Sequence, residues 1–265
     1  MIDVSELRAQ LVRPGSLWRQ IDYVAETGST NADLAAAARA GASPGTVLIT
    51  DYQSAGRGRL GRTWTAPPGM SIAMSVLLRP AGIQPQRWTW LPLLAGLAVA
   101  VGIERTLRER QIGLQLGLKW PNDVLAEGRK LSGILAERVE TSTGPVCVLG
   151  MGINVGLSAA ELPVPSATSL AVLLEDRAPT RSTVIAAVLN SLASILAEWE
   201  EREDAGVLAE YEQRCTTLGR AVRVHVSATR VVEGRATGLD KDGRLVVGTD
   251  SGPEVFGAGD VVHVR

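Results

Sequence analysis

Apolar residues recur at helical spacing in three segments of the chain. Residues 180–201 place Val184, Val188, Leu192 and Trp199 on one helical face. Residues 85–110 predict a second long helix, and residues 31–40 predict an alanine-rich helix. The Ser, Thr and Asn of GSTN (28–31) can cap the alanine-rich helix, which ends at Gly41.

Shorter apolar runs between these helices predict strands. Residues 46–53 and 71–79 each predict one strand, and the segment between them is rich in Gly, Arg and Pro. Residues 116–140 predict two strands around a turn at Glu127-Gly128, and residues 145–155 add another. The chain is therefore predicted to be α+β, with a mixed sheet flanked by helices, after a polar and loosely held start.

The pattern changes near the C-terminus to short alternating strands, at residues 221–226, 244–249 and 261–265. Turns are expected at Asp242-Gly243 and Ser251-Gly252. About fifty residues of this kind predict a small β-barrel. We place a domain boundary within residues 215–219, which divides the chain into domains 1–217 and 218–265.

Composition narrows the function classes. The chain has 265 residues, 45% hydrophobic and 21% charged, and a formal net charge of -1, which gives no general attraction to nucleic acid or membrane. Its longest apolar run, residues 88–103, contains Pro92 and is shorter than the roughly 20 residues that span a bilayer, so it predicts a buried helix. No secretory signal is visible, and a cytoplasmic protein is expected.

Cysteine and histidine are too sparse for common metal or triad sites. Cys147 and Cys215 form no CxxC pair, and Cys147 is expected to be a reduced, buried thiol. His225 and His263 lie in Val-rich stretches. A zinc site or a histidine-based triad is therefore poorly supplied, and no metal-ligating residues are predicted.

The segment GRGRLGR (56–62) formally contains G-x-G-x-x-G. A dinucleotide-binding fold needs a helix directly after this pattern and an acidic residue about 20 positions on. RTWTAPPGM follows instead, residues 52–103 hold no Asp or Glu, and no Lys-Ser/Thr pair makes a P-loop. What the segment offers is Arg57, Arg59 and Arg62 on a glycine frame, which suits phosphate or carboxylate binding. The alternative is a solvated basic turn.

Two further motifs carry polar groups at strand ends. In KWPND (119–123), Lys119 can neutralise an anion, while Asn122 and Asp123 can hydrogen-bond a ligand or hold a divalent ion; the alternative is a turn. Lys130 lies at the start of the next strand, where a lysine is often only an edge charge. Asn154 ends GMGIN (150–154) and can also be a turn cap. A basic glycine loop, two lysines on adjacent strands and an asparagine at a strand end together resemble a site for adenylate formation.

GRGRLGR, KWPND, KLSGIL (130–135) and GMGIN, in this order and spacing, resemble the biotin protein ligases. GSTN and the small C-terminal β-domain extend the resemblance from about Gln20 to the end of the chain. The resemblance implies the class II synthetase-like fold of biotin and lipoate ligases, with an SH3-like C-terminal barrel.

The resemblance also implies residue roles. The residues that would line the biotin pocket are Ser29, Thr30, Asn31 and Gln53. The residues that would form the loop binding biotin and phosphate are Arg57, Gly58 and Arg59. Lys130 would contact the reacting carboxylate and phosphate, and Trp64 would pack on adenine. The remaining nucleotide-side positions are Arg62, Lys119, Asn122, Asp123 and Asn154.

The implied activity uses ATP and magnesium to convert biotin to biotinyl-AMP, with release of pyrophosphate. Biotin then passes to one lysine of a biotin carboxyl carrier domain, of an acyl-CoA or pyruvate carboxylase. About 20 residues precede the catalytic region, whereas the operator-binding winged helix of some family members takes about 60, so no repressor activity is expected. Monomer and homodimer both stay open.

Two rival functions differ in class. A lipoate or octanoyl ligase would use a related fold with a different acid, and the arginine-rich glycine loop favours biotin. A nucleic-acid-binding protein could use the same loop and the barrel. However, the barrel segment mixes acidic with basic residues and has Phe256 as its sole aromatic, so it lacks a stacking surface.

Overall fold

A computed structural model describes the chain except for residues 1, 81, 202–204, 228 and 265. Its main body is a seven-stranded sheet with strand order β1-β2-β3-β7-β6-β5-β4. β1 and β2 are parallel, and each other neighbouring pair is antiparallel. The predicted mixed sheet is therefore confirmed. The strands are β1 Gln20–Thr27, β2 Thr46–Gln53, β3 Ser71–Leu78, β4 Leu116–Lys119, β5 Asp123–Ala126, β6 Arg129–Thr141 and β7 Gly144–Asn154.

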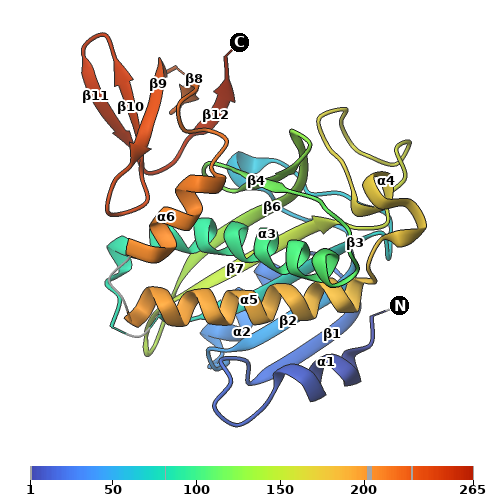
Figure 1. Cartoon of the computed structure of the whole chain (residues 1–265). Helices are drawn as coiled ribbons and strands as arrows, with labels where there is room; N and C mark the ends of the chain where they lie inside the picture. Colours follow the sequence, from blue (N-terminus) through green and yellow to red (C-terminus); the bar gives the residue numbers. More distant parts are fainter. Residues whose placement is uncertain (1, 81, 202–204, 228, 265) are drawn as a thin grey trace.

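Helices cover both faces of this sheet (Figure 1). The helices are α1 Val4–Leu11, α2 Thr30–Arg39, α3 Leu91–Glu109, α4 Leu170–Leu174, α5 Arg181–Glu201 and α6 Ala205–Arg214, with short 3-10 turns η1 Arg59–Gly61, η2 Pro85–Trp90 and η3 Glu175–Arg177. α3 and α5 lie side by side on one face. α2 packs on the other face, where Leu34 and Ala38 meet Leu77 and Val148. Because both faces are covered, every residue of the interior strand β3 is buried.

α3 and α5 are as apolar as some membrane-spanning helices. By length and composition, the helical segments Pro85–Glu109 and Arg181–Glu201 could each cross a membrane. Core helices of soluble proteins pass the same test, and the apolar windows of these two segments are 78% and 44% buried inside the protein. The prediction of a buried helix over residues 85–110 is confirmed, with the difference that its first turns are the 3-10 turn η2.

The start of the chain is not loosely held as expected. Asp3 caps α1 by accepting a hydrogen bond from the Glu6 N–H at 2.9 Å. Leu7 and Leu11 of α1 are buried, and the helix packs on β1 and α5. A helix of eight residues shows too few turns for its apolar spacing to stand out, which is why the sequence pattern missed it.

The burial of α1 predicts a cost for truncating Leu7, which is 1% exposed. Leu7→Ala should lower the free energy of unfolding by about 2–4 kcal/mol, because it removes buried methyl groups and leaves a cavity. Leu17→Ala is the matched control: its side chain is 36% exposed, so a change within about 0.5 kcal/mol is expected. Urea denaturation of both variants measures the difference, and equal values would contradict the packing of α1.

The C-terminal part is a five-stranded antiparallel sheet of order β11-β10-β9-β8-β12. The strands are β8 Ala221–His225, β9 Val231–Leu239, β10 Leu245–Thr249, β11 Gly252–Phe256 and β12 Asp260–His263. Gly243 and Gly252 have positive φ, which confirms both predicted turns. Strands β9 and β11 were not predicted from the pattern. Among the described residues, β11 and β12 are the two edge strands, and no pairing is recorded between them. The predicted barrel is therefore not closed by hydrogen bonds.

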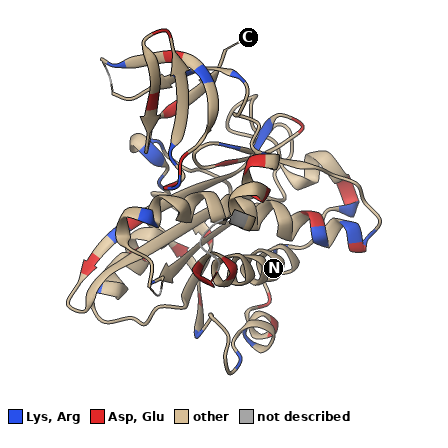
Figure 2. Cartoon of the chain, turned by 60° about the vertical axis from the view of Figure 1, so that its left-hand side comes forward, with Lys and Arg blue, Asp and Glu red and all other residues tan. Residues whose placement is uncertain are grey.

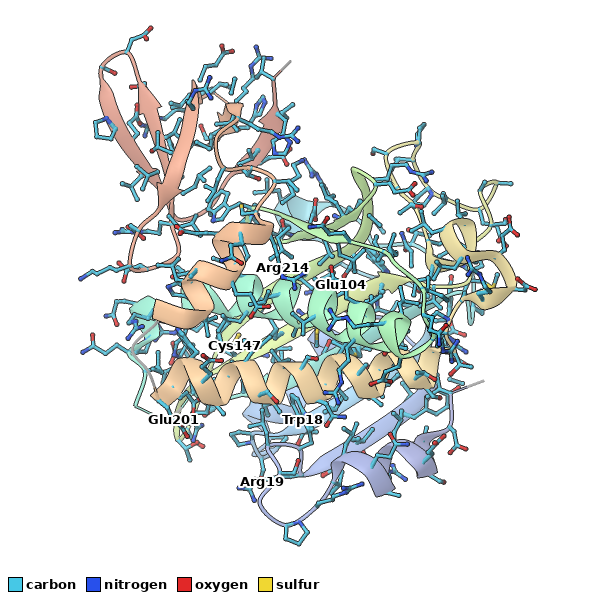
Figure 3. All side chains as sticks on the ribbon, in the orientation of Figure 1. Trp18, Arg19, Glu104, Cys147, Glu201 and Arg214 are labelled. Carbon is cyan, nitrogen blue, oxygen red and sulfur yellow. The ribbon has the colours of Figure 1, made fainter. Side chains whose placement is uncertain are left out.

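The connection between the two sheets is tied to the main body at α6. The Arg214 guanidinium donates to Glu104 of α3 at 2.7 Å, and the same carboxylate accepts from the Leu116 N–H at 2.8 Å (Figure 3). Residues 215–216 then run beside β4, where the Thr216 N–H donates to the Leu118 carbonyl. Figure 2 shows basic and acidic residues interspersed along the helices, the loops and the C-terminal sheet in that view.

Candidate active site

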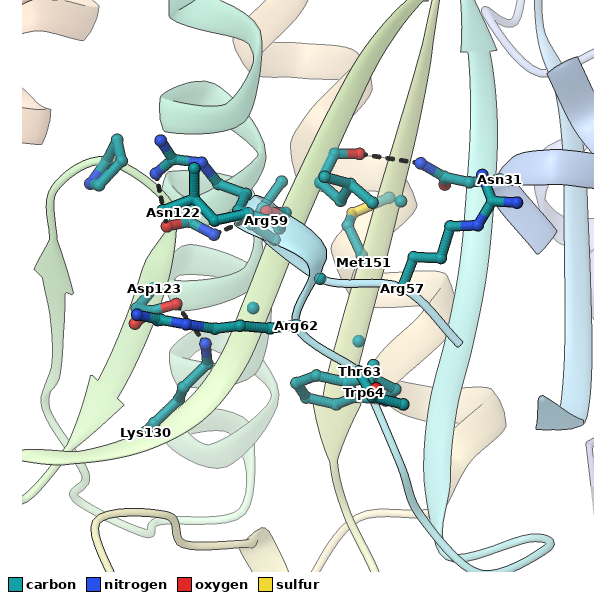
Figure 4. A pocket seen from close by; sticks show the side chains of 18 of the residues that line it. Asn31, Arg57, Arg59, Arg62, Thr63, Trp64, Asn122, Asp123, Lys130 and Met151 are labelled. Carbon is teal, nitrogen blue, oxygen red and sulfur yellow. Dashed lines mark hydrogen bonds and ion pairs between the residues drawn. The ribbon is translucent and has the colours of Figure 1, made fainter. Parts of the chain in front are cut away.

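One cavity gathers nearly all of the predicted site residues (Figure 4). It holds about 920 Å³ of empty space, open solvent at its mouth included. Its lining includes the predicted residues Ser29, Thr30, Asn31, Gln53, Arg57, Gly58, Arg59, Arg62, Trp64, Lys119, Asn122, Asp123 and Lys130. These residues come from β2, α2, the loop after β2, the turn between β4 and β5, and β6. The four motifs therefore converge on one place, although they are far apart in the sequence.

One end of the cavity is built from hydroxyl and amide groups at the start of α2. Ser29 is the N-cap of α2, as GSTN predicted, and its hydroxyl accepts from the Ala32 N–H. The Gln53 side-chain oxygen accepts from both the N–H and the hydroxyl of Thr30, at 2.8 and 3.1 Å. Ser75 on β3 donates to Asn31 Oδ1 at 2.7 Å. With its oxygen occupied in this way, the Gln53 amide keeps its N–H donors for other partners.

The basic loop over residues 54–70 is a compact turn rather than the entry to a helix. Arg57 pairs with Thr63 as an isolated bridge, and the Gly58 N–H donates to the Arg62 carbonyl at 2.7 Å. Leu60 at the tip has φ 56° and its side chain is 69% exposed. The only helical turn within the loop is η1, three residues long. This geometry agrees with rejecting the dinucleotide-binding interpretation of G-x-G-x-x-G.

Arg59 is the most enclosed of the three loop arginines. Its Nη1 donates to Asn122 Oδ1 at 3.2 Å, and Asn122 in turn donates to the Ile134 carbonyl at 2.8 Å. Burial lowers the pKa of Arg59, and the nearby carboxylates of Asp123 and Asp260 oppose that shift. A partly desolvated guanidinium gains more from an anionic ligand than an exposed one does. The KWPND turn thus holds Arg59 inside the cavity.

Lys130 faces the same space from β6. Its ammonium forms an ion pair with Asp123 Oδ1 at 2.5 Å (Figure 4). Its backbone pairs with Leu125 of β5 on one hand and with residues 166–168 on the other. Lys130 is therefore not an edge-blunting charge. The prediction that Lys119 and Lys130 lie on adjacent strands was wrong, because KWPND is a tight turn between β4 and β5, and β5 separates the two lysines.

Trp64 forms part of the cavity floor, over two glycines on neighbouring strands. A Cβ atom on Gly152 would lie 2.5 Å from the Trp64 ring, and one on Gly133 would lie 3.3 Å from it. These glycines let the indole lie flat on the sheet. The Trp64 Nε1 is buried and makes no hydrogen bond within the described part of the chain.

Asn154 is the predicted residue that the structure leaves out of the cavity lining. Its side chain is buried, and its Nδ2 donates to the Thr168 carbonyl at 3.0 Å. Thr168 also donates its N–H to the Lys130 carbonyl at 2.8 Å. Asn154 therefore tethers the segment that runs beside Lys130, and any effect on a ligand would pass through that segment.

The C-terminal sheet contributes a group that sequence reasoning missed. Asp260 on β12 lines the cavity and pairs with Arg62 of the basic loop. Burial alone would raise the pKa of Asp260, but the hydrogen bond from Arg62 and the charge of Lys119 bring it below its usual range. Asp260 lies 198 residues from Arg62, and no motif marks it. The carboxylate therefore connects the two sheets at the mouth of the cavity.

The KWPND turn is also supported by Thr217, which lies just before the C-terminal sheet. Thr217 accepts a hydrogen bond from the Trp120 N–H at 3.1 Å and lies 3.2 Å from His263 Nε2. Burial, together with the positive charges of Lys119 and Arg220, lowers the pKa of His263 to about 4. His263 is therefore neutral near pH 7.

This shift predicts a pH dependence of stability. The unfolded histidine titrates near 6.5 and the folded one near 4, so between these values the unfolded state binds more protons. The contribution of His263 should be complete above about pH 6.5 and should be lost as the pH falls toward 4. Urea denaturation of the wild type and of His263→Gln at several pH values tests this. Equal slopes of unfolding free energy against pH would contradict it.

No group of three or more His, Cys, Asp or Glu side chains suited to hold a metal occurs among the described residues. Both cysteines are buried, and burial raises the pKa of Cys147 to about 12. A thiol of this kind is not a nucleophile near neutral pH.

Taken together, the cavity offers two different environments. Hydroxyl and amide groups at one end suit a neutral polar ligand, while arginines and lysines at the other suit phosphate and carboxylate oxygens. A flat indole lies between the loop and the sheet. The arrangement can bring a carboxylic acid and a nucleotide phosphate together among positive charges.

Comparison with known proteins agrees with this chemistry. The family model "Biotin/lipoate A/B protein ligase family" matches residues 27–154, and "Biotin protein ligase C terminal domain" matches residues 217–264. A biotin--[acetyl-CoA-carboxylase] ligase of Mycobacterium tuberculosis is 43% identical over 100% of this chain and 96% of its own length. One of Paracoccus denitrificans is 31% identical, with 90% and 98% covered.

A solved structure also matches. The biotin protein ligase from Aquifex aeolicus in complex with biotin and ATP superposes with a TM-score of 0.77 at 27% identity, covering 94% of this chain and 100% of that one. The mixed sheet with its helices and the C-terminal antiparallel sheet are both included in this match. By its sequence, its fold and the residues gathered in its cavity, the chain belongs to the biotin protein ligase family.

Proposed function

We propose that this ligase activates biotin with ATP to form biotinyl-AMP, and then transfers biotin to a lysine of an acceptor protein. One observation carries the proposal: four separate motifs place a basic loop, two lysines and a hydroxyl-amide pocket around one cavity. The Aquifex aeolicus structure, described as a complex with biotin and ATP, supports the choice of both substrates.

Each end of the cavity suits one substrate. The ring system of biotin would occupy the hydroxyl-amide end, formed by Ser29, Thr30, Asn31 and Gln53. Its carboxylate would then reach the loop of Arg57, Gly58 and Arg59, and the ammonium of Lys130. The nucleotide would pack on Trp64, with Arg62, Lys119, Asn122 and Asp123 near its phosphates and sugar. Asn154 would act indirectly, because it tethers residue 168.

In the first step a carboxylate oxygen of biotin would attack the α-phosphorus of ATP, and the bond to the pyrophosphate oxygen would break. Negative charge on the transferring phosphoryl group would be stabilised by Lys130 and Arg59, which are already held in place by Asp123 and Asn122. In the second step the acceptor amine would attack the acyl carbon, AMP would leave, and the amine would lose one proton.

Magnesium fits this site as a companion of ATP rather than as a resident ion. The two carboxylates in the cavity, Asp123 and Asp260, are each paired with a cation of the protein. Mg²⁺ is commonly held by substrate phosphates plus one or two carboxylates, so Asp123 is the residue best placed to share it. When bound, the ion would neutralise charge on the phosphates.

The acceptor would be a biotin carboxyl carrier domain of an acyl-CoA or pyruvate carboxylase. The names of the relatives from Mycobacterium tuberculosis and Paracoccus denitrificans specify acetyl-CoA carboxylase. We place the catalytic domain at residues 1–217, the C-terminal domain at 218–265, and the enzyme in the cytoplasm.

Biotin-dependent exchange of labelled pyrophosphate into ATP tests the proposal directly. Exchange should require biotin and should not respond to lipoate in a parallel sample. The lipoate sample matters because the matching family model covers both acids. If exchange occurs with lipoate and not with biotin, lipoate is the substrate. If neither acid supports exchange, the proposed adenylation is rejected.

A further inference from the structure

The side chain of Asn31 is held by three groups of the protein. Its Nδ2 donates to Glu137 Oε2 at 2.7 Å and to the Leu135 carbonyl at 3.2 Å. Its Oδ1 accepts from the Ser75 hydroxyl at 2.7 Å. Asn31 is buried and lines the cavity. Both amide hydrogens are therefore used within the protein, and only the oxygen has capacity left for a ligand.

Glu137 decides which way round this amide lies. The carboxylate of Glu137 and the carbonyl of Leu135 only accept hydrogen bonds, so the NH₂ group of Asn31 must face them. Its oxygen then faces β3 and β7. Gly150 on β7 leaves the space that this requires, because a Cβ atom there would lie 2.2 Å from Asn31 Oδ1.

Glu137 itself lies outside the cavity lining. It is on β6 and lines a separate surface hollow together with the basic loop and residues 135–136. Asn31 is the residue that joins it to the cavity. The hydrogen bond to Asn31 is thus a direct connection between Glu137 and a ligand at this end.

We infer that Glu137 is a positioning residue for substrate selection: it fixes Asn31 as a hydrogen-bond acceptor, so that this end of the cavity selects an acid with an N–H donor. The inference rests on the proposed function, in which biotin occupies this end. The cyclic urea of biotin carries two N–H donors, whereas the dithiolane of lipoate and the chain of octanoate carry none. The Ser75 hydroxyl uses one acceptor site of Asn31 Oδ1, and only an acid with an N–H can fill the second one, so biotin gains a hydrogen bond that those acids cannot make.

The alternative is that Glu137 only ties α2 to β6. The two roles predict different effects of a substitution at Glu137 on stability, kcat and the two KM values. A structural tie would affect stability, kcat and both KM values together. A positioning role should raise the KM for biotin and leave the KM for ATP and kcat near wild type.

The test compares Glu137→Ala, Glu137→Gln and the matched control Glu140→Gln in the exchange assay. Glu140 is on the same strand but pairs with Arg138 at the surface. Glu137→Ala should raise the KM for biotin roughly 10-fold or more, because it removes a charged acceptor from a buried donor. Glu137→Gln can still accept from Asn31, so a rise of less than about 3-fold is expected. Glu140→Gln should match the wild type.

A double-mutant cycle with Asn31→Ala completes the test. If Glu137 acts through Asn31, the double variant should have nearly the same KM for biotin as Asn31→Ala alone. Should Glu137→Ala fail to fold, Glu137→Met keeps the bulk of the side chain without an acceptor and takes its place. A wild-type KM for biotin in Glu137→Ala, or in Glu137→Met where that variant replaces it, would overturn the inference. Additive effects of the two substitutions in the cycle would overturn it as well. Absence of biotin-dependent exchange in the wild type would instead reject the proposed function.

Discussion

Replacing Lys130 with alanine is expected to reduce biotin-dependent pyrophosphate exchange by a factor on the order of 100 to 1000, which is the usual cost of removing one group that stabilises developing charge. Lys130 lies in the cavity with its ammonium 2.5 Å from Asp123. The backbone on both sides of it is paired, so its Cα is fixed. An alanine cannot supply the charge from that place.

The chain has only three lysines, and two of them, Lys119 and Lys130, line the cavity. The third, Lys241, is exposed in the turn between β9 and β10 and provides the control. Lys241→Ala should leave exchange at the wild-type rate. Lys130→Arg should keep the charge but misplace it, and an intermediate rate is expected. Exchange within a few-fold of wild type in Lys130→Ala would show that the lysine does not act in adenylation.

The sequence pattern predicted most of the main body because each element there has a strong local signal. The alanine-rich helix with its GSTN cap, the apolar strands β2 and β3, and the long helices α3 and α5 are all where they were expected. Elements that were missed include α1, β1, α4, α6, β9 and β11, and several of them have weak local signals. α1 is short, β9 contains two glycines, and β11 begins with Gly252 and Pro253. Their formation depends on tertiary packing, which a local pattern does not contain.

In the candidate site, too, residues in local motifs were predicted and residues that depend on tertiary contacts were missed. Thirteen predicted residues line one cavity because they belong to motifs that could be recognised as units. The prediction that Lys119 and Lys130 lie on adjacent strands was wrong because the chain reverses twice within a few residues, at 120–122 and at Glu127-Gly128. Asp260 and Glu137 could not be found from the sequence. Each acts by contact with a residue more than a hundred positions away, Arg62 and Asn31 respectively.

Two glycines on β7 explain how the two ends of the cavity are kept apart. Gly150 leaves room for Asn31, and Gly152 leaves room for the ring of Trp64. They are two residues apart on one strand, so they face the same side of the sheet. Neither has a positive φ, so neither is required for backbone conformation. Both positions are therefore glycine because of the side chain that lies on them.

Gly152→Ala is accordingly expected to raise the KM for ATP by roughly 5- to 150-fold, the range that follows from overpacking costs of about 1–3 kcal/mol. The added Cβ would lie 2.5 Å from the indole, and that ring would have to leave the sheet surface. The KM for biotin should change much less, whereas Gly150→Ala, with its Cβ 2.2 Å from Asn31 Oδ1, should show the reverse preference. Gly238→Ala, on a strand with open space at its Cβ, is the matched control and should leave both values unchanged. If both cavity variants raise the two KM values equally, the separation into a biotin end and a nucleotide end is wrong, because the two substitutions would then act on one shared environment.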